Sequence, residues 1–153
     1  THQFVNILRK LNVDRLDAIQ AIGEDFAWQI DNSSVEAMLK LSANETLPIM
    51  CFVGNKGCIQ IHSGPVEAIK TMGPWLNIMD PTFHLHLRTD RIAEVWAVRK
   101  PTDKGHVTSL EAYDADGDMI IQFFGKRVEG QDERPVWREI MESLPRVDGR
   151  KAA

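Results

Sequence analysis

A histidine near the start of the chain has the clearest capacity for chemistry. The segment THQFVNILRK and the residue after it carry apolar side chains at the i, i+3, i+4, i+7 spacing of an amphipathic helix: Phe4, Ile7, Leu8 and Leu11. At about 100° per residue, His2 falls on the helix face opposite this apolar stripe. Two interpretations follow: a solvated histidine at a frayed helix end, or a metal ligand presented outward to a cofactor.

The other four histidines occur in patterns that carry less information. His84 and His86 alternate with apolar residues in FHLHL, so they share one face of a predicted strand, where they could hold a metal ion or simply face water. His62 and His106 lie beside predicted turns, and we expect both to be solvated. The sequence has no G-x-S-x-G motif, no phosphate-binding glycine loop and no recognisable nucleophile, base and acid spacing.

One predicted strand, MIIQFFG at 119–125, is apolar on both faces. A sheet covered on one side usually alternates apolar and polar residues, yet Ile120, Gln122 and Phe124 place only one amide on the second face. Met50 and Phe52 repeat this pattern in the strand IMCFV. The second face could therefore pack against another domain or subunit, or against a flat apolar ligand.

Cationic residues border this second face in the sequence. Lys100 ends one predicted strand, Arg127 follows another, and Arg15 begins a predicted helix. Each alone is an ordinary surface charge. Together they could bind the carboxylate arms of a planar ligand, because arginine pairs with carboxylates through a planar fork and lysine as a mobile charge. Haem has this shape, and histidine is a common ligand of its iron.

The elements that position these residues are helices near both ends and a run of strands between them. Helix patterns occur at the N-terminus, at 13–22 between a cap at Asn12 and a stop at Gly23, through 36–39, and after Pro135. Strand patterns occur at 26–30, 47–53, 58–62, 75–79, 83–87, 91–100, 107–113 and 119–125, while 63–74 is expected to be irregular with some local helix. This order predicts an α+β fold: a large antiparallel meander with the N-terminal helices and a C-terminal helix packed on one face.

The composition fits one globular domain over residues 1–145, followed by a flexible tail over 146–153. The net charge of −4 disfavours sequence-independent binding to nucleic acid. No apolar run approaches the ~20 residues of a membrane span, and no secretory signal pattern opens the sequence, so we expect a cytoplasmic protein without membrane insertion. Alternating apolar surroundings favour buried free thiols over a disulfide for Cys51 and Cys58.

Several long motifs resemble the C-terminal half of the HemS/ChuS/HmuS haemin-degrading proteins, and the likeness covers almost the whole chain. These motifs are THQF, FVGNKGCIQIHSGPVE, MGPWLNIMDPTFHLHL, IAEVWAVRKPT, VTSLEAYDADG and QFFGKR. The resemblance implies a bacterial cytoplasmic protein of haem uptake and iron utilisation that binds, passes on or degrades haem. The alternative is an interaction module whose apolar sheet face docks a partner domain without binding haem.

The resemblance also implies a set of haem contacts. It makes His2 the ligand of the haem iron, and it assigns the remaining contacts to Arg15, Phe52, Lys100, Gln122, Phe124 and Arg127. Relatives often carry tyrosine where Phe124 stands, so this chain keeps a stacking surface but lacks a phenolic hydrogen bond.

The two-half architecture of the relatives implies partners and limits. In them the other half supplies an arginine on the distal side of the iron, so this half alone is expected to bind haem and to degrade it poorly. The implied partners are the sister half or a second copy of the chain, and an importer that delivers haem on the cytoplasmic side.

Overall fold

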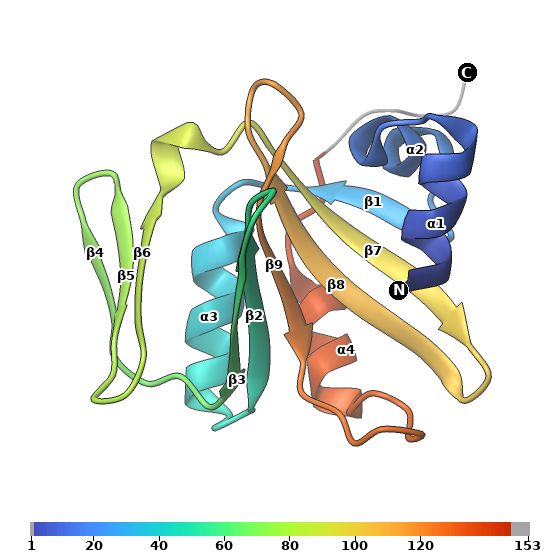
Figure 1. Cartoon of the computed structure of the whole chain (residues 1–153). Coiled ribbons are helices and arrows are strands. Elements are labelled where there is room, and N and C mark those ends of the chain that lie inside the picture. The colour runs from blue at the N-terminus through green and yellow to red at the C-terminus, as the bar shows by residue number, and fades with distance from the viewer. Residues whose placement is uncertain (1, 148–153) are drawn as a thin grey trace.

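A six-stranded antiparallel sheet forms the centre of this computed structural model, which describes residues 2–147 (Figure 1). Its strands, in spatial order, are β1 (Ala27–Ile30), β7 (Glu94–Thr102), β8 (Gly105–Tyr113), β9 (Met119–Gly125), β2 (Ile49–Gly54) and β3 (Ile59–Gly64). A separate three-stranded sheet consists of β4 (Ile69–Met72), β5 (Trp75–Met79) and β6 (His84–Arg88). The predicted α+β class is confirmed.

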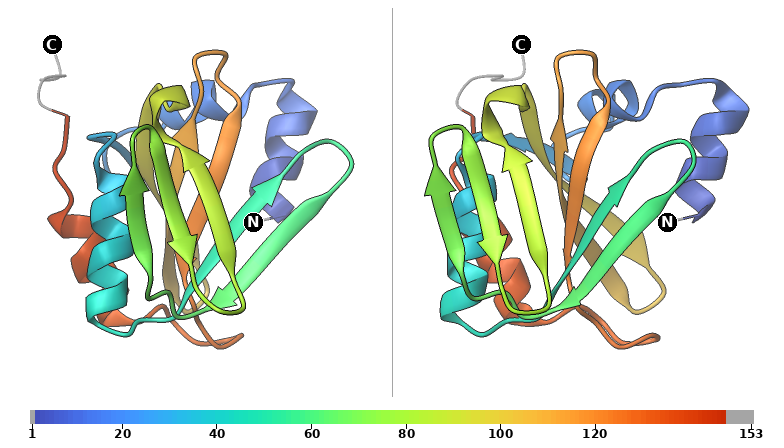
Figure 2. Two further views of the ribbon diagram at one scale, coloured as in Figure 1. Left: turned by 90° about the vertical axis from the view of Figure 1, so that its left-hand side faces the viewer. Right: turned by 60° about the vertical axis from the view of Figure 1, so that its left-hand side comes forward.

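Four α-helices accompany the sheets: α1 (His2–Leu11), α2 (Arg15–Ala21), α3 (Ser34–Asn44) and α4 (Pro135–Ser143), with a 3-10 turn at Thr89–Arg91. The views in Figures 1 and 2 show α1 and α2 on one side of the large sheet and α3 and α4 on the other. The helices therefore cover both faces of the sheet, where the sequence predicted only one.

The first face of the large sheet packs against α3 and α4 and forms the main core. Along β8 and β9 most inward positions are apolar, and Leu110 and Phe123, which are paired across the strands, are fully buried. Trp137 of α4 is also fully buried, and its indole N–H donates to the carbonyl of Thr108. This burial fixes the register, since a shift by one residue would turn every apolar side chain outward.

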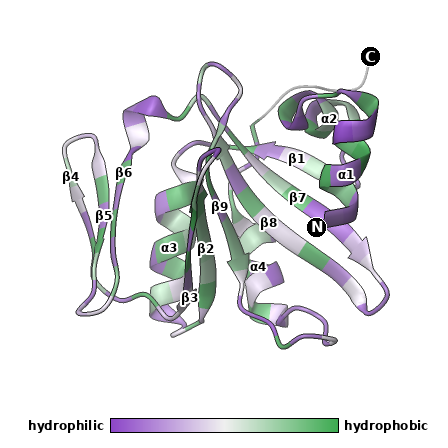
Figure 3. Ribbon diagram, viewed as in Figure 1, coloured by the Kyte–Doolittle hydropathy of each residue, from purple (hydrophilic) through white to green (hydrophobic). Residues whose placement is uncertain are grey.

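The opposite face, called the second face below, is covered only in part. Ile19 of α2 packs there with Ala27, Val98 and Tyr113. Strand pairing places Phe52, Gln122 and Glu111 side by side across β2, β9 and β8 on this same face. Hydrophobic colouring along β2 and β9 is visible in Figure 3.

Three details of the sequence prediction are wrong. Strand β6 pairs with β5 in the small sheet and not with the meander, which contains only β7, β8 and β9. Residues 69–72 form β4, because Gly73 turns the chain with a positive φ of 56° and lets this segment pair with β5. Asn12 does not cap α2, since it adopts a left-handed φ of 51°, and Asp14 occupies the cap position.

The C-terminal end of the described region differs from the predicted flexible tail. Arg146 and Val147, which the sequence placed in the flexible tail, lie along β1: Arg146 forms a bridge with Ile30, and the amide of Val147 donates to the carbonyl of Gln29. The rest of the predicted tail, 148–153, lies outside the described residues. Within 2–147, no helix has the length and apolar character of a membrane span.

The two cysteines are free, as predicted, but they differ in exposure. Cys51 of β2 is buried in the main core, and this burial raises the pKa of its thiol to about 12. Cys58 is exposed, contrary to the prediction, because it follows directly on the turn in which the Asn55 side chain accepts the amides of Gly57 and Cys58.

Candidate functional site

A fully buried carboxylate occupies the middle of the second face. Glu111 of β8 accepts two hydrogen bonds from Arg15 at the start of α2, from Nε to Oε2 at 3.0 Å and from Nη2 to Oε1 at 2.6 Å. The hydroxyls of Ser109 and Tyr113, on the same strand, donate to it at 2.9 and 2.5 Å. This carboxylate ties α2 to the sheet.

Two further residues on neighbouring strands reach the same carboxylate. Gln122 of β9 donates its side-chain amide to Glu111 Oε1 at 2.8 Å. Lys100 of β7 places Nζ 3.8 Å from Oε1, but this buried ammonium has no hydrogen-bond partner among the described residues. Lys100 is therefore a buried cation whose donors are available to another group.

Burial and neighbouring charges both shift the pKa values of the residues in this cluster. Burial alone would raise the pKa of Glu111, but the hydrogen bonds and charge of Arg15, with the charge of Lys100, outweigh it and lower the pKa to about 2. Burial dominates at Lys100, where it lowers the pKa to about 8 although the charge of Glu111 opposes this shift. Burial and the Glu111 charge both raise the pKa of Tyr113, so its phenol stays a donor.

Aromatic rings surround these polar groups. The ammonium of Lys100 lies 5.7 Å from the ring centres of both Phe4 and Phe124, and the guanidinium of Arg15 lies 5.1 Å from that of Phe4. Phe52 and Phe124 pack edge to face at 5.4 Å. Cations at such distances interact favourably with ring faces, so the cluster offers charge beside aromatic surface.

The second face continues as apolar surface onto the β2–β3 hairpin. Ile61 pairs with Phe52 and Ile59 with Gly54, and the two isoleucines remain 54% and 60% exposed. In Figure 2, this hairpin and α1 project on the same side of the large sheet. Such a broad exposed apolar strip beside cationic groups is typical of a ligand or partner surface.

His2 lies in the first turn of α1, where its side chain is exposed. Phe4, in the same turn, contacts the cluster through Arg15 and Lys100. Packing of Phe4 therefore places the first turn of α1 beside the second face. A hollow of about 290 Å³ between α1, α2 and β7 includes Phe4, Ile19 and Lys100 in its lining. This volume is just below the range of small-molecule sites, which is roughly 300–1,000 Å³.

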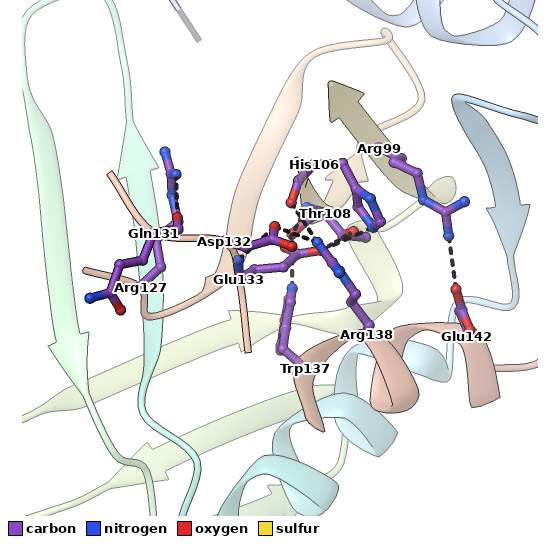
Figure 4. A network of polar contacts seen from close by, with 10 residues as sticks. All are labelled: Arg99, His106, Thr108, Arg127, Gln131, Asp132, Glu133, Trp137, Arg138 and Glu142. Carbon is purple, nitrogen blue, oxygen red and sulfur yellow. Dashed lines mark hydrogen bonds and ion pairs between the residues drawn. The ribbon is translucent and has the colours of Figure 1, made fainter. Parts of the chain in front are cut away.

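Arg127 lies apart from the other predicted contacts. It follows β9 in an exposed loop and donates from Nη1 to the carbonyl of Gln131 at 3.3 Å, beside a second polar network (Figure 4). In that network the buried carboxylate of Glu133 accepts the amide and hydroxyl of Thr108 and the Nε of Arg138. Five predicted contacts, namely Arg15, Phe52, Lys100, Gln122 and Phe124, are thus brought together, while Arg127 is not.

The remaining histidines show no convergence on a metal site. His84 and His86 are exposed on β6 with ring centres 6.4 Å apart, and Nδ1 of His86 lies 2.7 Å from the side-chain oxygen of Asn77. His62 is half-buried and stacks on Phe83 at 3.8 Å, so it is not simply solvated. Across residues 2–147, no group of three histidine, cysteine or acidic side chains is arranged to hold a metal ion.

His106 likewise departs from the predicted solvated state. It is half-buried, with Nε2 3.4 Å from a carboxylate oxygen of Glu133, and burial together with the charge of Arg138 lowers its pKa. Sequence reasoning also missed Glu111, the residue on which the cluster converges. Its signal was present in VTSLEAY, where a glutamate stands between Leu110 and Ala112, on the same strand face as two hydroxyl residues.

Comparison with known proteins gives matches over almost the whole chain. Residues 12–144 match the family described as the haemin-degrading HemS.ChuX domain. The hemin transport protein HemS of Yersinia enterocolitica is 44% identical over 147 residues, which are 96% of this chain and 43% of that protein. HmuS of Yersinia pestis, also a hemin transport protein, is 43% identical with the same coverage. The chain therefore spans less than half the length of these curated relatives.

Solved structures share this architecture, and two of them are also similar in sequence. Holo-PhuS, a heme-binding protein from Pseudomonas aeruginosa, has 46% sequence identity and a TM-score of 0.93 over 96% of this chain and 42% of its own. ChuS, an E. coli heme oxygenase, has 44% identity and a TM-score of 0.90 over 94% and 44%. ChuX shares the fold at a TM-score of 0.73 with 9% identity.

Proposed function

Because the chain belongs to the haemin-degrading HemS.ChuX domain family, we propose that it binds haem on the second face of its large sheet. The observation that carries this proposal is the ammonium of Lys100, which is buried, has no hydrogen-bond partner within residues 2–147, and lies beside the ring of Phe124. Glu111 is already paired with Arg15 and faces Lys100 at 3.8 Å without a hydrogen bond, so a ligand that brings a further anion and accepts a hydrogen bond would stabilise the buried ammonium. The carboxylates of haem supply that charge on a flat apolar molecule.

The residues around Lys100 suit the separate parts of haem. The rings of Phe52 and Phe124 would contact the macrocycle. Arg15 binds Glu111 through Nε and Nη2, which leaves Nη1 for a haem carboxylate. His2, exposed on the first turn of α1, would ligate the iron. Arg127 would join these contacts only if its exposed hydrogen bond to Gln131 were exchanged for one to haem.

Bound haem would supply the iron and the macrocycle on which any degradation takes place. The residues of this chain would hold the ring, orient its carboxylates and ligate the metal.

We place this activity in the cytoplasm as part of haem uptake and iron utilisation. Two free cysteines fit a reducing compartment. The relatives' greater length supports a sister half as partner; the poor turnover expected of this half stays a prediction.

A haemin titration tests the proposed function. The wild-type chain should give a saturable Soret band, and His2→Ala should bind more weakly with a shifted Soret maximum, because the axial imidazole is lost. His84→Ala is a matched control, since His84 is an exposed histidine on the small sheet. Equal spectra for wild type and His2→Ala would contradict ligation by His2. No saturable change in the Soret band of haemin with any variant would favour the interaction module that docks a partner domain without binding haem.

A further inference from the structure

Glu111 is the common partner of three proposed haem contacts, although it cannot itself touch a ligand. Its side chain has no exposed surface, and Arg15, Gln122 and Lys100 approach it from α2, β9 and β7. We propose that Glu111 is a positioning residue, which holds these three side chains from behind so that their remaining donors face the haem carboxylates. This inference rests on the proposed haem site.

The hydrogen bonds of Glu111 fix its own position first. Oε2 accepts Arg15 Nε and the phenol of Tyr113, while Oε1 accepts Arg15 Nη2, Ser109 and Gln122. Ser109 and Tyr113 stand two residues before and after Glu111 on the same face of β8, so the strand itself orients the carboxylate. With both oxygens occupied, the directions of the Arg15 fork and the Gln122 amide are set before a ligand arrives.

The charges of the cluster favour the binding of a further anion. Two cations, Arg15 and Lys100, face one carboxylate, so one positive charge is unbalanced within an aromatic surround. The bonded partner of Glu111 is Arg15, and Lys100 stands off at 3.8 Å. Removal of the Glu111 charge would leave both cations uncompensated, which disfavours the charged form of Lys100.

The decisive readout is the pH dependence of haem affinity. In the wild type, affinity should fall as pH rises through about 8, because Lys100 then loses its charge; the groups that face Lys100 are Glu111, Arg15 and, through Glu111, Tyr113. Glu111→Gln should weaken haem binding near neutral pH by about 10- to 100-fold. This is the usual effect of removing a residue that orients a binding side chain through a hydrogen bond. It should also move the midpoint of the fall below that of the wild type, since the charge of Glu111 raises the pKa of Lys100.

A haem analogue without free carboxylates distinguishes a loss of carboxylate binding from a general disruption of the site. Haemin dimethyl ester lacks free carboxylates, so wild type and Glu111→Gln should bind it with equal affinity. Glu142→Gln is the matched control variant: Glu142 also pairs with an arginine, Arg99, at 2.9 Å, but it lies on α4 at the first face. This variant should retain the wild-type haem affinity and midpoint.

Glu111→Asp tests the positioning role of Glu111 if Glu111→Gln fails to fold. It keeps the charge but is one methylene shorter, so it cannot hold Arg15 and Gln122 together, and haem affinity should fall while the pH midpoint stays near that of the wild type. Unchanged affinity and midpoint in the folded Glu111 variant, with a His2-dependent Soret band in the wild type, would overturn this inference alone. A wild type without haem binding would overturn the proposed function as well.

Discussion

The ionised carboxylate of Glu111 stabilises the fold only within a definite pH range. Its pKa is about 2 in the folded chain, below the ordinary value of 4.5, because Arg15 and Lys100 outweigh the cost of its burial. Folding then favours the deprotonated form, so the stabilisation is complete above about pH 4.5 and is lost as pH falls toward 2. Within that range the unfolded chain binds the proton more readily.

Acid unfolding of Glu111→Gln tests this linkage. The wild type should lose free energy of unfolding between about pH 4.5 and 2, and this loss should be smaller in the variant. Near neutral pH the variant should be less stable by about 3–5 kcal/mol, because Arg15 stays buried without its partner. Arg15→Met in the same chain should recover part of that loss. Urea unfolding followed by circular dichroism gives these values; equal acid profiles would contradict the account.

The site residues that could be predicted from sequence are those with a periodic or motif signal. Alternation in MIIQFFG and IMCFV placed Phe52, Gln122 and Phe124 on one face, and the strand pairing confirms this placement. The glutamate in VTSLEAY marks a polar position in the strand, but its pairing with Arg15 could not be predicted, because the two residues are 96 positions apart in sequence. The proposed contact of Arg127 stays untested, since a motif match does not give the direction of a loop side chain.

At the scale of elements, β9 and α4 are held together by a very close approach. Gly125 ends β9 directly against the indole of Trp137, and a Cβ built at Gly125 would lie 2.5 Å from Trp137 Cγ. The side chain of Trp137 is fully buried and hydrogen-bonded, so it cannot move aside without loss of core packing. This contact fixes the strand that carries Gln122 and Phe124.

Gly125→Ala should therefore destabilise the chain by about 1–3 kcal/mol, the usual cost of overpacking. Gly57→Ala is the control, because its Cβ would approach nothing closer than 3.7 Å and its φ is not positive. That variant should stay within about 0.5 kcal/mol of wild type. Thermal unfolding of both variants measures the difference, and an unchanged melting temperature for Gly125→Ala would show that the contact is relaxed at no cost.

Sequence patterns predicted most elements but not how the strands are shared between two sheets. Alternation identifies strands at 75–79 and 83–87, yet it contains no information about pairing partners. The buried residues Leu76, Ile78 and Leu87 let the small sheet pack against the main core as a separate layer. The segment 69–72 was missed because its residues alternate weakly and a glycine turn follows it.

At the scale of the whole molecule, the two faces of the large sheet have different tasks. The first face is closed by α3 and α4 and supplies the main core. The second face is covered around Ile19 and over Glu111 and Phe124, whereas Phe52 and Gln122 stay partly exposed next to the charged cluster. The small sheet also exposes apolar side chains, namely those of Met72, Trp75 and Met79. Haem could bind to them without specificity.

Paramagnetic broadening by ferric haem most directly tests where haem binds. With the chain labelled for NMR, one equivalent of haemin should broaden the amide signals of β9, β2 and the first turn of α1, and leave those of β4 to β6 sharp. Broadening centred on Met72, Trp75 and Met79, with sharp signals from Gln122 and Phe124, would contradict the proposed site.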